Sequence, residues 1–201
     1  MRQFQTTKLR FTDDTGRECL LGLCQDVTEA MQIKREYTQK LAMVQNMAEI
    51  DALTGIKNKN SYKERELLMN KRIAEHRQPE FAIIVCDMND LKIINDTLGH
   101  EAGDKCICEA CDIICKTFKQ SPVYRIGGDE FVVISQDEDY GRSEELLGII
   151  AQQNEKALRH GGIVIACGMQ KYTNEEDVAS VFKEADKKMY ENKKYLKSRN
   201  K

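Results

Sequence analysis

The stretch Arg125-Ile126-Gly127-Gly128-Asp129-Glu130-Phe131 is the most informative part of this sequence. Apolar runs at 123–126 and 131–135 flank a short connection that opens with two glycines and closes with two carboxylates. Apolar strands around a glycine-containing turn predict a β-hairpin. Glycines at such a tip let the phosphates of a ligand approach the backbone closely, and neighbouring carboxylates suit divalent cations. The stretch therefore predicts a hairpin whose tip binds phosphate together with a metal ion.

A further carboxylate lies at Asp87, directly after the apolar run 81–86. A carboxylate at the end of a buried strand is costly unless it has a partner. A helix N-cap or a lysine would be a purely structural partner. If the strand instead lies beside the hairpin, Asp87, Asp129 and Glu130 converge, and such oxygen ligands suit Mg²⁺. That arrangement is the one used in two-metal phosphoryl transfer.

The hairpin tip resembles, letter for letter, the signature of the GGDEF domains, the diguanylate cyclases. Three further blocks resemble other motifs of that family and occur in the family's order. They lie at residues 51–58 (D-x-L-T-G-L-x-N), 87–104 (D-x-[DN]-x-[FL]-K-x-[IV]-N-D, then G-H and G-D) and 185–193 (A-D-x-A-[LM]-Y-x-A-K). The resemblance covers residues 51–197, nearly three quarters of the chain.

The resemblance implies a site for Mg²⁺ or Mn²⁺. In the family the first Asp of the D-x-[DN] block and the next residue's carbonyl bind metal. The third residue of the signature binds metal and is the favoured general base, and the fourth is also essential. These positions are Asp87, Met88, Asp129 and Glu130 here. Substrate phosphates would then lie against the backbone of Gly127-Gly128.

The resemblance also implies a nucleotide site. Asn95 and Asp104 match the positions that bind guanine, and a carboxylate can accept hydrogen bonds from its N1–H and exocyclic amine. Helix capping is the structural alternative for both residues. Lys92 matches a catalytic lysine that neutralises phosphate charge, and Lys193 and Lys197 match C-terminal triphosphate contacts. A lone lysine on a charged helix is usually only solvated, and the closing block departs from the family pattern at Lys197.

The product-inhibition site of the family is missing from the sequence. The family has R-x-x-D shortly before the signature, where this chain has Phe118-Lys119-Gln120-Ser121. Neither the guanidinium nor the carboxylate needed to bind a guanine is present. We expect no product inhibition through this surface.

The apolar periodicity predicts an α/β domain. Helices are expected at 59–76, 91–98, 104–119, 143–158 and 177–194, with strands at 81–86 and 162–168 and the hairpin at 123–136. Strands mixed with helices around a hairpin predict a mixed, partly antiparallel central sheet flanked by helices. The resemblance implies the fold shared by nucleotidyl cyclases and polymerase palm domains.

The N-terminal quarter differs from this domain. Residues 1–28 read as two short strands, 8–12 and 19–24, and the run ending at Thr28 resembles the end of a PAS sensor domain. The chain would then begin inside a longer protein. Residues 29–50 contain no Gly or Pro and predict a helical linker to a GGDEF catalytic domain at 51–201. The apolar stripe of the predicted linker helix comprises Ala30, Ile33, Tyr37, Leu41, Val44 and Ala48. We prefer a coiled-coil-like dimer stalk over a helix packed on its own domain.

Composition limits the remaining possibilities. The 201 residues suit one domain plus an appendage. A net charge of −2 gives no footprint for nucleic acid or an anionic membrane. No apolar run approaches the roughly 20 residues of a membrane span, and the N-terminus is no signal peptide. Cytoplasmic residence is the expectation.

Four cysteines are crowded at Cys106, Cys108, Cys111 and Cys115. A metal or redox site is one interpretation. Packing is the preferred one, because cysteine is a small and frequently buried residue. Four ligands spread along one helix also point around more than one face, which a tetrahedral site does not tolerate.

The motifs and the resemblance together predict a bacterial signalling enzyme. One GTP per protomer would meet its counterpart across a homodimer, and each 3′-hydroxyl would attack the other α-phosphate. The products would be cyclic di-GMP and two pyrophosphates. The alternatives are a non-catalytic GGDEF domain that binds GTP and a pure dimerisation module.

Overall fold

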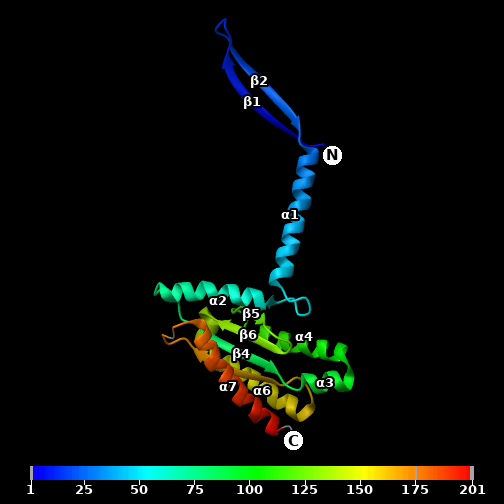
Figure 1. Ribbon diagram of the computed structural model, residues 1–201, viewed down its shortest axis with the longest axis vertical. Helices are drawn as coiled ribbons and strands as arrows, with labels where there is room; N and C mark the ends of the chain where they lie inside the picture. Colours follow the sequence, from blue (N-terminus) through cyan, green and yellow to red (C-terminus); the bar gives the residue numbers. More distant parts are fainter. Residues whose placement is uncertain (1, 175, 200–201) are drawn as a thin grey trace. The chain divides into compact units, whose positions relative to one another are not determined.

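A computed structural model of the chain describes residues 2–174 and 176–199. The side chains at 39, 41–43 and 45–47 lie outside the described residues, so Leu41 of the expected apolar stripe is not assessed. The chain divides into two compact units, Met1–Asn46 and Met47–Lys201 (Figure 1).

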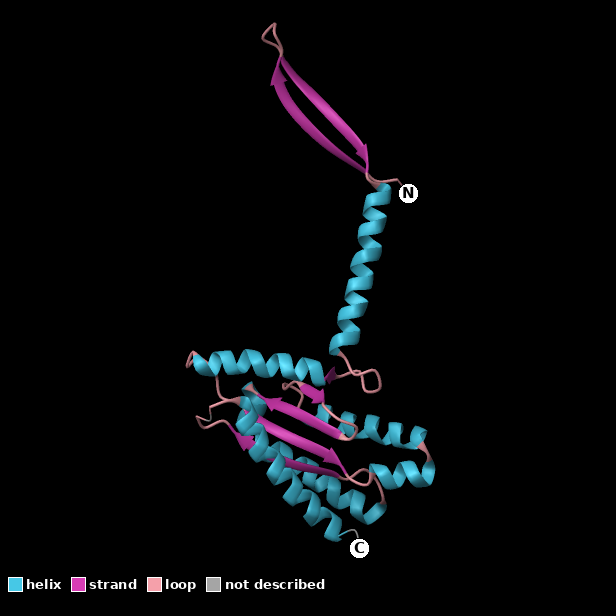
Figure 2. Ribbon diagram, viewed as in Figure 1, coloured by secondary structure: helices cyan, strands magenta, loops and turns pink. Residues whose placement is uncertain are grey.

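The first unit contains a β-hairpin and most of a helix. Strands β1 (Phe4–Thr12) and β2 (Glu18–Asp26) pair antiparallel, and helix α1 (Thr28–Glu49) follows (Figure 2). The carboxylate of Asp13 accepts hydrogen bonds from the backbone N–H groups of Thr15 and Arg17 and so closes the turn. All of β1 is exposed, so this ribbon encloses no core. Its two strands are longer than the sequence predicts.

The second unit is built on a five-stranded sheet in the order β3-β5-β6-β4-β7. Its strands are β3 (Lys57–Asn58), β4 (Ala82–Met88), β5 (Val123–Arg125), β6 (Glu130–Ser135) and β7 (Ile165–Lys171). Strand β4 pairs antiparallel with β6 and β7, β5 pairs antiparallel with β6, and β3 pairs parallel with β5. The expected mixed, partly antiparallel sheet is confirmed.

Helices of the described residues flank the sheet: α2 (Lys59–Ala74), α3 (Leu91–Leu98), α4 (His100–Thr117), α5 (Asp137–Gly141), α6 (Ser143–His160) and α7 (Val178–Arg199). Helix α4 begins earlier than expected, because the single residue Gly99, at φ +85°, both ends α3 and precedes α4. Strand β3 and the short helix α5 were not predicted. Their two and five residues are too few for a periodic signal.

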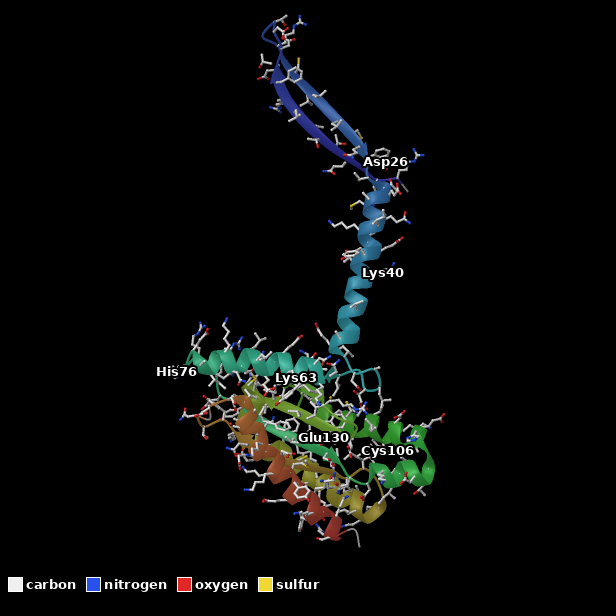
Figure 3. All side chains as sticks on the ribbon, viewed as in Figure 1. Asp26, Lys40, Lys63, His76, Cys106 and Glu130 are labelled. Carbon is white, nitrogen blue, oxygen red and sulfur yellow. The ribbon has the colours of Figure 1, made fainter. Side chains whose placement is uncertain are left out.

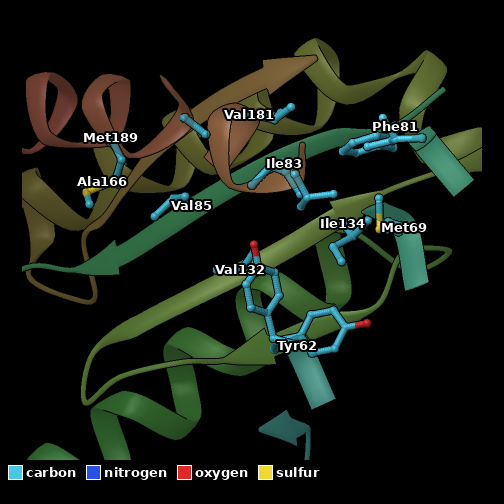
Figure 4. Packing of buried hydrophobic residues seen from close by; sticks show 14 of the residues in the cluster. Tyr62, Met69, Phe81, Ile83, Val85, Val132, Ile134, Ala166, Val181 and Met189 are labelled. Atoms are coloured by element: carbon cyan, nitrogen blue, oxygen red, sulfur yellow. The ribbon is translucent and has the colours of Figure 1, made fainter. Parts of the chain in front are cut away.

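The core forms two layers on either side of β4, all of which is buried. Ile83 and Val85 point to one face, where they pack with side chains of α2 and α7 (Figure 4). Ile84 and Cys86 point to the other face, which α4 and α6 cover. This alternation follows from the two-residue period of a strand. Burying one such aliphatic side chain contributes about 1.5–3 kcal/mol.

None of the described helices combines the length and the apolar character that crossing a bilayer requires.

Candidate functional site at the end of strand β4

The end of β4 lies beside the start of β6, which is the arrangement that a convergence of Asp87 with the hairpin tip requires. Asp87 and Glu130 are directly opposite each other in the antiparallel pair, so their side chains share one face of the sheet. The backbone N–H of Met88 donates to the carbonyl oxygen of Asp129 at 3.0 Å. The strand pairing thus brings together the residues that two distant motifs contribute.

The connection between β5 and β6 is tight. The N–H of Ile126 donates to the carbonyl of Glu130 at 3.0 Å. A Cβ atom at Gly127 would lie 2.6 Å from Oε2 of Glu130, so the glycine lets that carboxylate lie against the backbone. Figure 3 labels Glu130 among the side chains of this unit. Gly128 is open, with no atom near the position that a Cβ would take. The first glycine therefore packs against the site, and the second leaves the backbone accessible.

Arg125 anchors this connection to the opening motif. Its Nη1 atom lies 2.9 Å from Oδ1 of Asp51, and its Nε and Nη2 atoms donate to the carbonyl of Gly128 at 3.2 and 2.8 Å. Burial alone would raise the pKa of Asp51. Hydrogen bonds from Thr54 and the charge of Arg125 outweigh it and leave the pKa below its ordinary value. Both residues belong to recognisable motifs, but the sequence predicted no role for either of them.

Lys193 of α7 contacts the end of β4. Its Nζ atom lies 2.5 Å from Oδ1 of Asp87. Asp87 is 5% exposed, and burial raises the pKa of its carboxyl above the ordinary value. The contact with Lys193 opposes that rise, while the charges of Asp129 and Glu130 add to it. The structural alternative considered for Asp87, a lysine partner, is therefore present.

A cavity of about 430 Å³ opens beside this pair. It is lined by Asp87, Glu130, Asp186, Met189, Tyr190, Lys193, Lys194 and Lys197. Lys197 also lies 3.6 Å from Asp90, which precedes α3. Carboxylates from the sheet and lysines from α7 thus line one cavity. Asp186 and Lys194 were not expected there. Each lies four residues from Tyr190, a helical spacing that places both beside this cavity-lining residue.

Two contacts fix α7 against the sheet. A Cβ atom at Gly168 of β7 would lie 2.1 Å from the backbone nitrogen of Met189, so the helix and strand backbones are in direct contact. The side-chain oxygen of Asn192 accepts a hydrogen bond of 3.0 Å from the N–H of Cys167. These contacts fix the position of α7 along the sheet, and so they place Lys193 beside the end of β4.

The expected guanine residues lie on a different pair of helices. Asn95 is on α3, and a Cβ atom at Gly103 of α4 would lie only 1.9 Å from its Oδ1 atom. Asp104 follows Gly103 and is exposed. The structure therefore brings Asn95 close to the turn of α4 that carries Asp104. Lys92 is exposed on α3 and does not line the cavity beside α7.

The residues in place of the inhibitory motif are structural. Phe118 is 1% exposed and belongs to the core. The hydroxyl of Ser121 donates to Oδ2 of Asp139 at 2.9 Å, and the N–H of Gln120 donates to the same atom at 2.8 Å. Asp139 thus closes the turn that leads into β5.

The cysteines of α4 pack on the sheet. Cys111 is buried, and Cys106 and Cys115 pack against the same apolar cluster. The Sγ atoms of Cys111 and Cys115 lie 4.0 Å apart, and Cys108 contacts the carbonyl of Leu53. Within residues 2–174 and 176–199, no three acidic, histidine or cysteine side chains are grouped closely enough to hold a metal ion. The contacts agree with the packing interpretation.

The fold and these motifs are those of a nucleotidyl cyclase-like domain. Residues 48–199 match the family model described as "Diguanylate cyclase, GGDEF domain". The chain belongs to this family.

Known proteins with similar sequence or fold agree. Diguanylate cyclase DgcS of Shewanella oneidensis is 31% identical over 173 residues, which is 85% of this chain and 55% of DgcS. The chain thus spans about half the length of that relative. The coiled coil and GGDEF domain of DgcB from Caulobacter crescentus, solved with c-di-GMP, has a TM-score of 0.71 at 21% identity and covers 84% of this chain and 93% of its own. A microbial GGDEF domain solved with cyclic di-GMP has a TM-score of 0.58 at 27% identity, over 74% of this chain and 94% of its own.

Proposed function

We propose that this chain is an active diguanylate cyclase, which condenses two GTP molecules into cyclic di-GMP and releases two pyrophosphates. The observation that carries the proposal is the pair Asp87 and Glu130, which lines a cavity of about 430 Å³ together with lysines of α7. Carboxylates for an ion and ammonium groups for phosphates thus line the same space. The similarity to DgcS supports the same activity.

The chain's candidates for holding Mg²⁺ or Mn²⁺ are Asp87, the carbonyl of Met88, Asp129 and Glu130. The contact of Asp87 with Lys193 supports the fit, since the carboxylate already accepts a cation at 2.5 Å. No three-ligand cage exists among the described side chains, so waters and substrate phosphates would complete the coordination, as Mg²⁺ prefers. A bound ion would lower the pKa of the attacking 3′-hydroxyl and offset the charge of the triphosphate.

The remaining residues position the substrate. Asp129 accepts the proton of the 3′-hydroxyl as general base, and Lys92, Lys193 and Lys197 bind phosphate oxygens. The backbone at Gly127-Gly128 admits the phosphates, since Gly128 carries no neighbour within 4 Å of a Cβ position. Such placement of reactants is a large part of catalysis in phosphoryl transfer.

Guanine is bound between α3 and α4 by Asn95 and Asp104. Gly103 supports this assignment, because its lack of a side chain lets Asn95 pack against α4 next to Asp104. The carboxylate of Asp104 accepts from the donors of guanine, whereas the same edge of adenine presents an acceptor nitrogen.

Cyclisation requires two protomers, since each site holds one GTP. We assign dimerisation to α1 and to the surface around the site. The exposed Ile33, Tyr37 and Val44 on α1 suit a helical partner. Residues 1–28 are then the end of a PAS-like sensor domain, and signalling by this protein takes place in the cytoplasm, where its substrate GTP is found. Product inhibition through an R-x-x-D site is absent.

Incubation with GTP and Mg²⁺, followed by separation of the products, tests this function. Asp129→Asn and Glu130→Gln should each abolish most cyclic di-GMP formation while leaving the fold intact. Asp137→Asn is the matched control, because Asp137 is an exposed carboxylate at the start of α5, which follows the end of β6 opposite to Glu130. Binding of GTP without turnover by the wild type would favour the non-catalytic alternative, and absence of binding would favour a dimerisation module.

A further inference from the structure

Two cysteines of the central sheet face each other across neighbouring strands. Cys86 of β4 and Cys167 of β7 are direct cross-strand partners, and both are free thiols. Their Sγ atoms lie 3.4 Å apart, with the Cys167 thiol donating to the Cys86 sulfur. Cys86 is completely buried, whereas Cys167 is partly exposed.

The hydrogen bonding around Cys167 defines the type of this strand pair. Its N–H donates outward to Asn192 on α7, and the N–H of Ile165 donates outward to Asn154 on α6. The backbone N–H of Cys167 therefore does not bond to β4, and Cys167 and Cys86 form what is called a non-hydrogen-bonded pair of the ladder. The Cα atoms of such pairs lie about 4.5 Å apart, which is within the usual disulfide range of about 4.4–6.8 Å. A disulfide needs only a small movement of the backbone.

Cys167 is also accessible. It lines a cavity of about 310 Å³ between α6 and α7, together with Asn154, Asn192 and Tyr195. A small oxidant that enters this cavity meets the Cys167 sulfur first. Cys86 lies behind it, in the position of a thiol that attacks an oxidised neighbour.

We propose that Cys86 and Cys167 form a reversible disulfide when the protein meets a peroxide. The Cys167 sulfur attacks the O–O bond of hydrogen peroxide, becomes a sulfenic acid and releases one water molecule. The Cys86 sulfur then attacks the Cys167 sulfur and displaces the second water. The two thiols lose two electrons and two protons, and the peroxide is reduced to two waters. A thiol reductant restores both cysteines by exchange.

The disulfide adjoins the candidate site through the backbone. Cys86 immediately precedes Asp87, and Asn192, which bonds to Cys167, immediately precedes Lys193. Closing the sulfurs from 3.4 Å to about 2.05 Å draws β4 and β7 together. This displaces Asp87 and Lys193, and a misplacement of about 1 Å can lower a rate about a hundredfold. This consequence rests on the proposed function, whereas the disulfide itself does not.

Helix α4 provides a comparison pair. The sulfurs of Cys111 and Cys115 lie 4.0 Å apart on successive turns. Cβ atoms at this helical spacing are about 5–6 Å apart, beyond the roughly 3.5–4.5 Å of disulfides. These two cysteines should stay unlinked under the same treatment.

Peptide mapping tests the disulfide. The reduced protein is treated with hydrogen peroxide, free thiols are alkylated, and a tryptic digest is analysed by mass spectrometry. Residues 78–92 and 160–171 each carry a single cysteine, so the expected product is these two peptides joined with the loss of two hydrogens. The linked peptide should disappear with dithiothreitol and be absent in Cys167→Ser, yet persist in Cys115→Ser. Stable oxidation of Cys167 without linkage, or no reaction, would overturn the proposal.

Turnover then tests the coupling. The fully linked protein should form cyclic di-GMP at least about tenfold more slowly than the reduced protein, within the hundredfold scale for misplaced groups. Reduction should restore the rate, and Cys167→Ser should show no loss with peroxide. Unchanged turnover after complete linkage would disprove the coupling. Absence of turnover in the reduced protein would instead contradict the proposed function, and the linked peptide would still establish the disulfide.

Discussion

The ammonium group of Lys193 lies 2.5 Å from Oδ1 of Asp87, so a protein cation already contacts the carboxylate that we assign to metal binding. The contact is partly sheltered, with the Lys193 side chain 23% exposed. A metal ion and the lysine would therefore compete for one oxygen. For an ion to bind at this oxygen, Lys193 must first release Asp87, and the freed ammonium group can then bind a phosphate.

Removal of this lysine should separate metal binding from turnover. Lys193→Ala should bind Mn²⁺ in the absence of nucleotide about tenfold more tightly, equivalent to about 1.4 kcal/mol, because the competing cation is gone. Its turnover of GTP should fall, since a phosphate contact is lost. Lys194→Ala is the matched control, because Lys194 lines the same cavity but packs over the Tyr190 ring. Titration of Mn²⁺ by calorimetry measures the change, and equal affinity in both variants would disprove the competition.

The raised pKa of Asp87 predicts a dependence of stability on pH. The folded carboxyl holds its proton more tightly than the unfolded one, whose ordinary pKa is 3.8. The wild type should therefore lose free energy of unfolding, relative to Asp87→Asn, as the pH rises from 3.8 through the raised pKa of Asp87. Denaturant unfolding without metal at a series of pH values measures this difference. If the free energy of unfolding of the wild type instead rose relative to that of Asp87→Asn with rising pH, the pKa of the folded carboxyl would not be raised by burial.

Arg125 should stabilise the hairpin tip more than an ordinary surface arginine does. Arg125→Ala removes three hydrogen bonds and leaves Asp51 without its ion pair, so we expect a loss of about 2–4 kcal/mol of unfolding free energy. Arg125→Lys should recover only part of it, because lysine lacks the planar fork. Arg142→Ala is the control. Its pair with Glu145 is exposed, so its removal should cost little stability. Similar losses for Arg125→Ala and Arg142→Ala would contradict the anchoring role.

Asp104 should decide the choice of base. Asp104→Ser removes the acceptor for the N–H groups of guanine, which is worth on the order of 1–3 kcal/mol. The preference for GTP over ATP should fall correspondingly, measured as the ratio of kcat/KM values. Glu101→Gln, on the same helix and exposed, should leave the ratio unchanged. Unaltered discrimination in Asp104→Ser would place the guanine site elsewhere.

Product should not inhibit through the surface that precedes the hairpin. Phe118 is buried and Ser121 is bonded to Asp139, so neither offers a charged contact to a guanine. Initial rates at several GTP concentrations, with added cyclic di-GMP, should show at most competitive inhibition. Non-competitive inhibition at low product concentration would reveal another regulatory surface.

Local patterns account for much of what the sequence determined. The two-residue period of β4, the glycines before β6 and the 3.6-residue period of the helices are properties of neighbouring residues. They predicted the mixed sheet and the position of most of its elements. The short elements β3 and α5 were not predicted, because two or five residues are too few to show a periodic pattern of apolar residues. The start of α4 was predicted too late in the chain, because the single residue Gly99 is both the C-cap of α3 and the N-cap of α4.

Tertiary structure alone decided which of these residues meet. Asp51 and Arg125 are 74 residues apart, Cys86 and Cys167 are 81 residues apart, and the contact of Asp87 with Lys193 spans even more of the chain. Each contact depends on the strand order of the sheet and on where α7 packs against β7. A periodic pattern states which side of a strand or helix is buried, but it does not state which distant element covers that side. The packing of the two core layers on either side of β4 determines which distant element covers each side. This packing brings Asp87, Glu130 and Lys193 together from separate motifs.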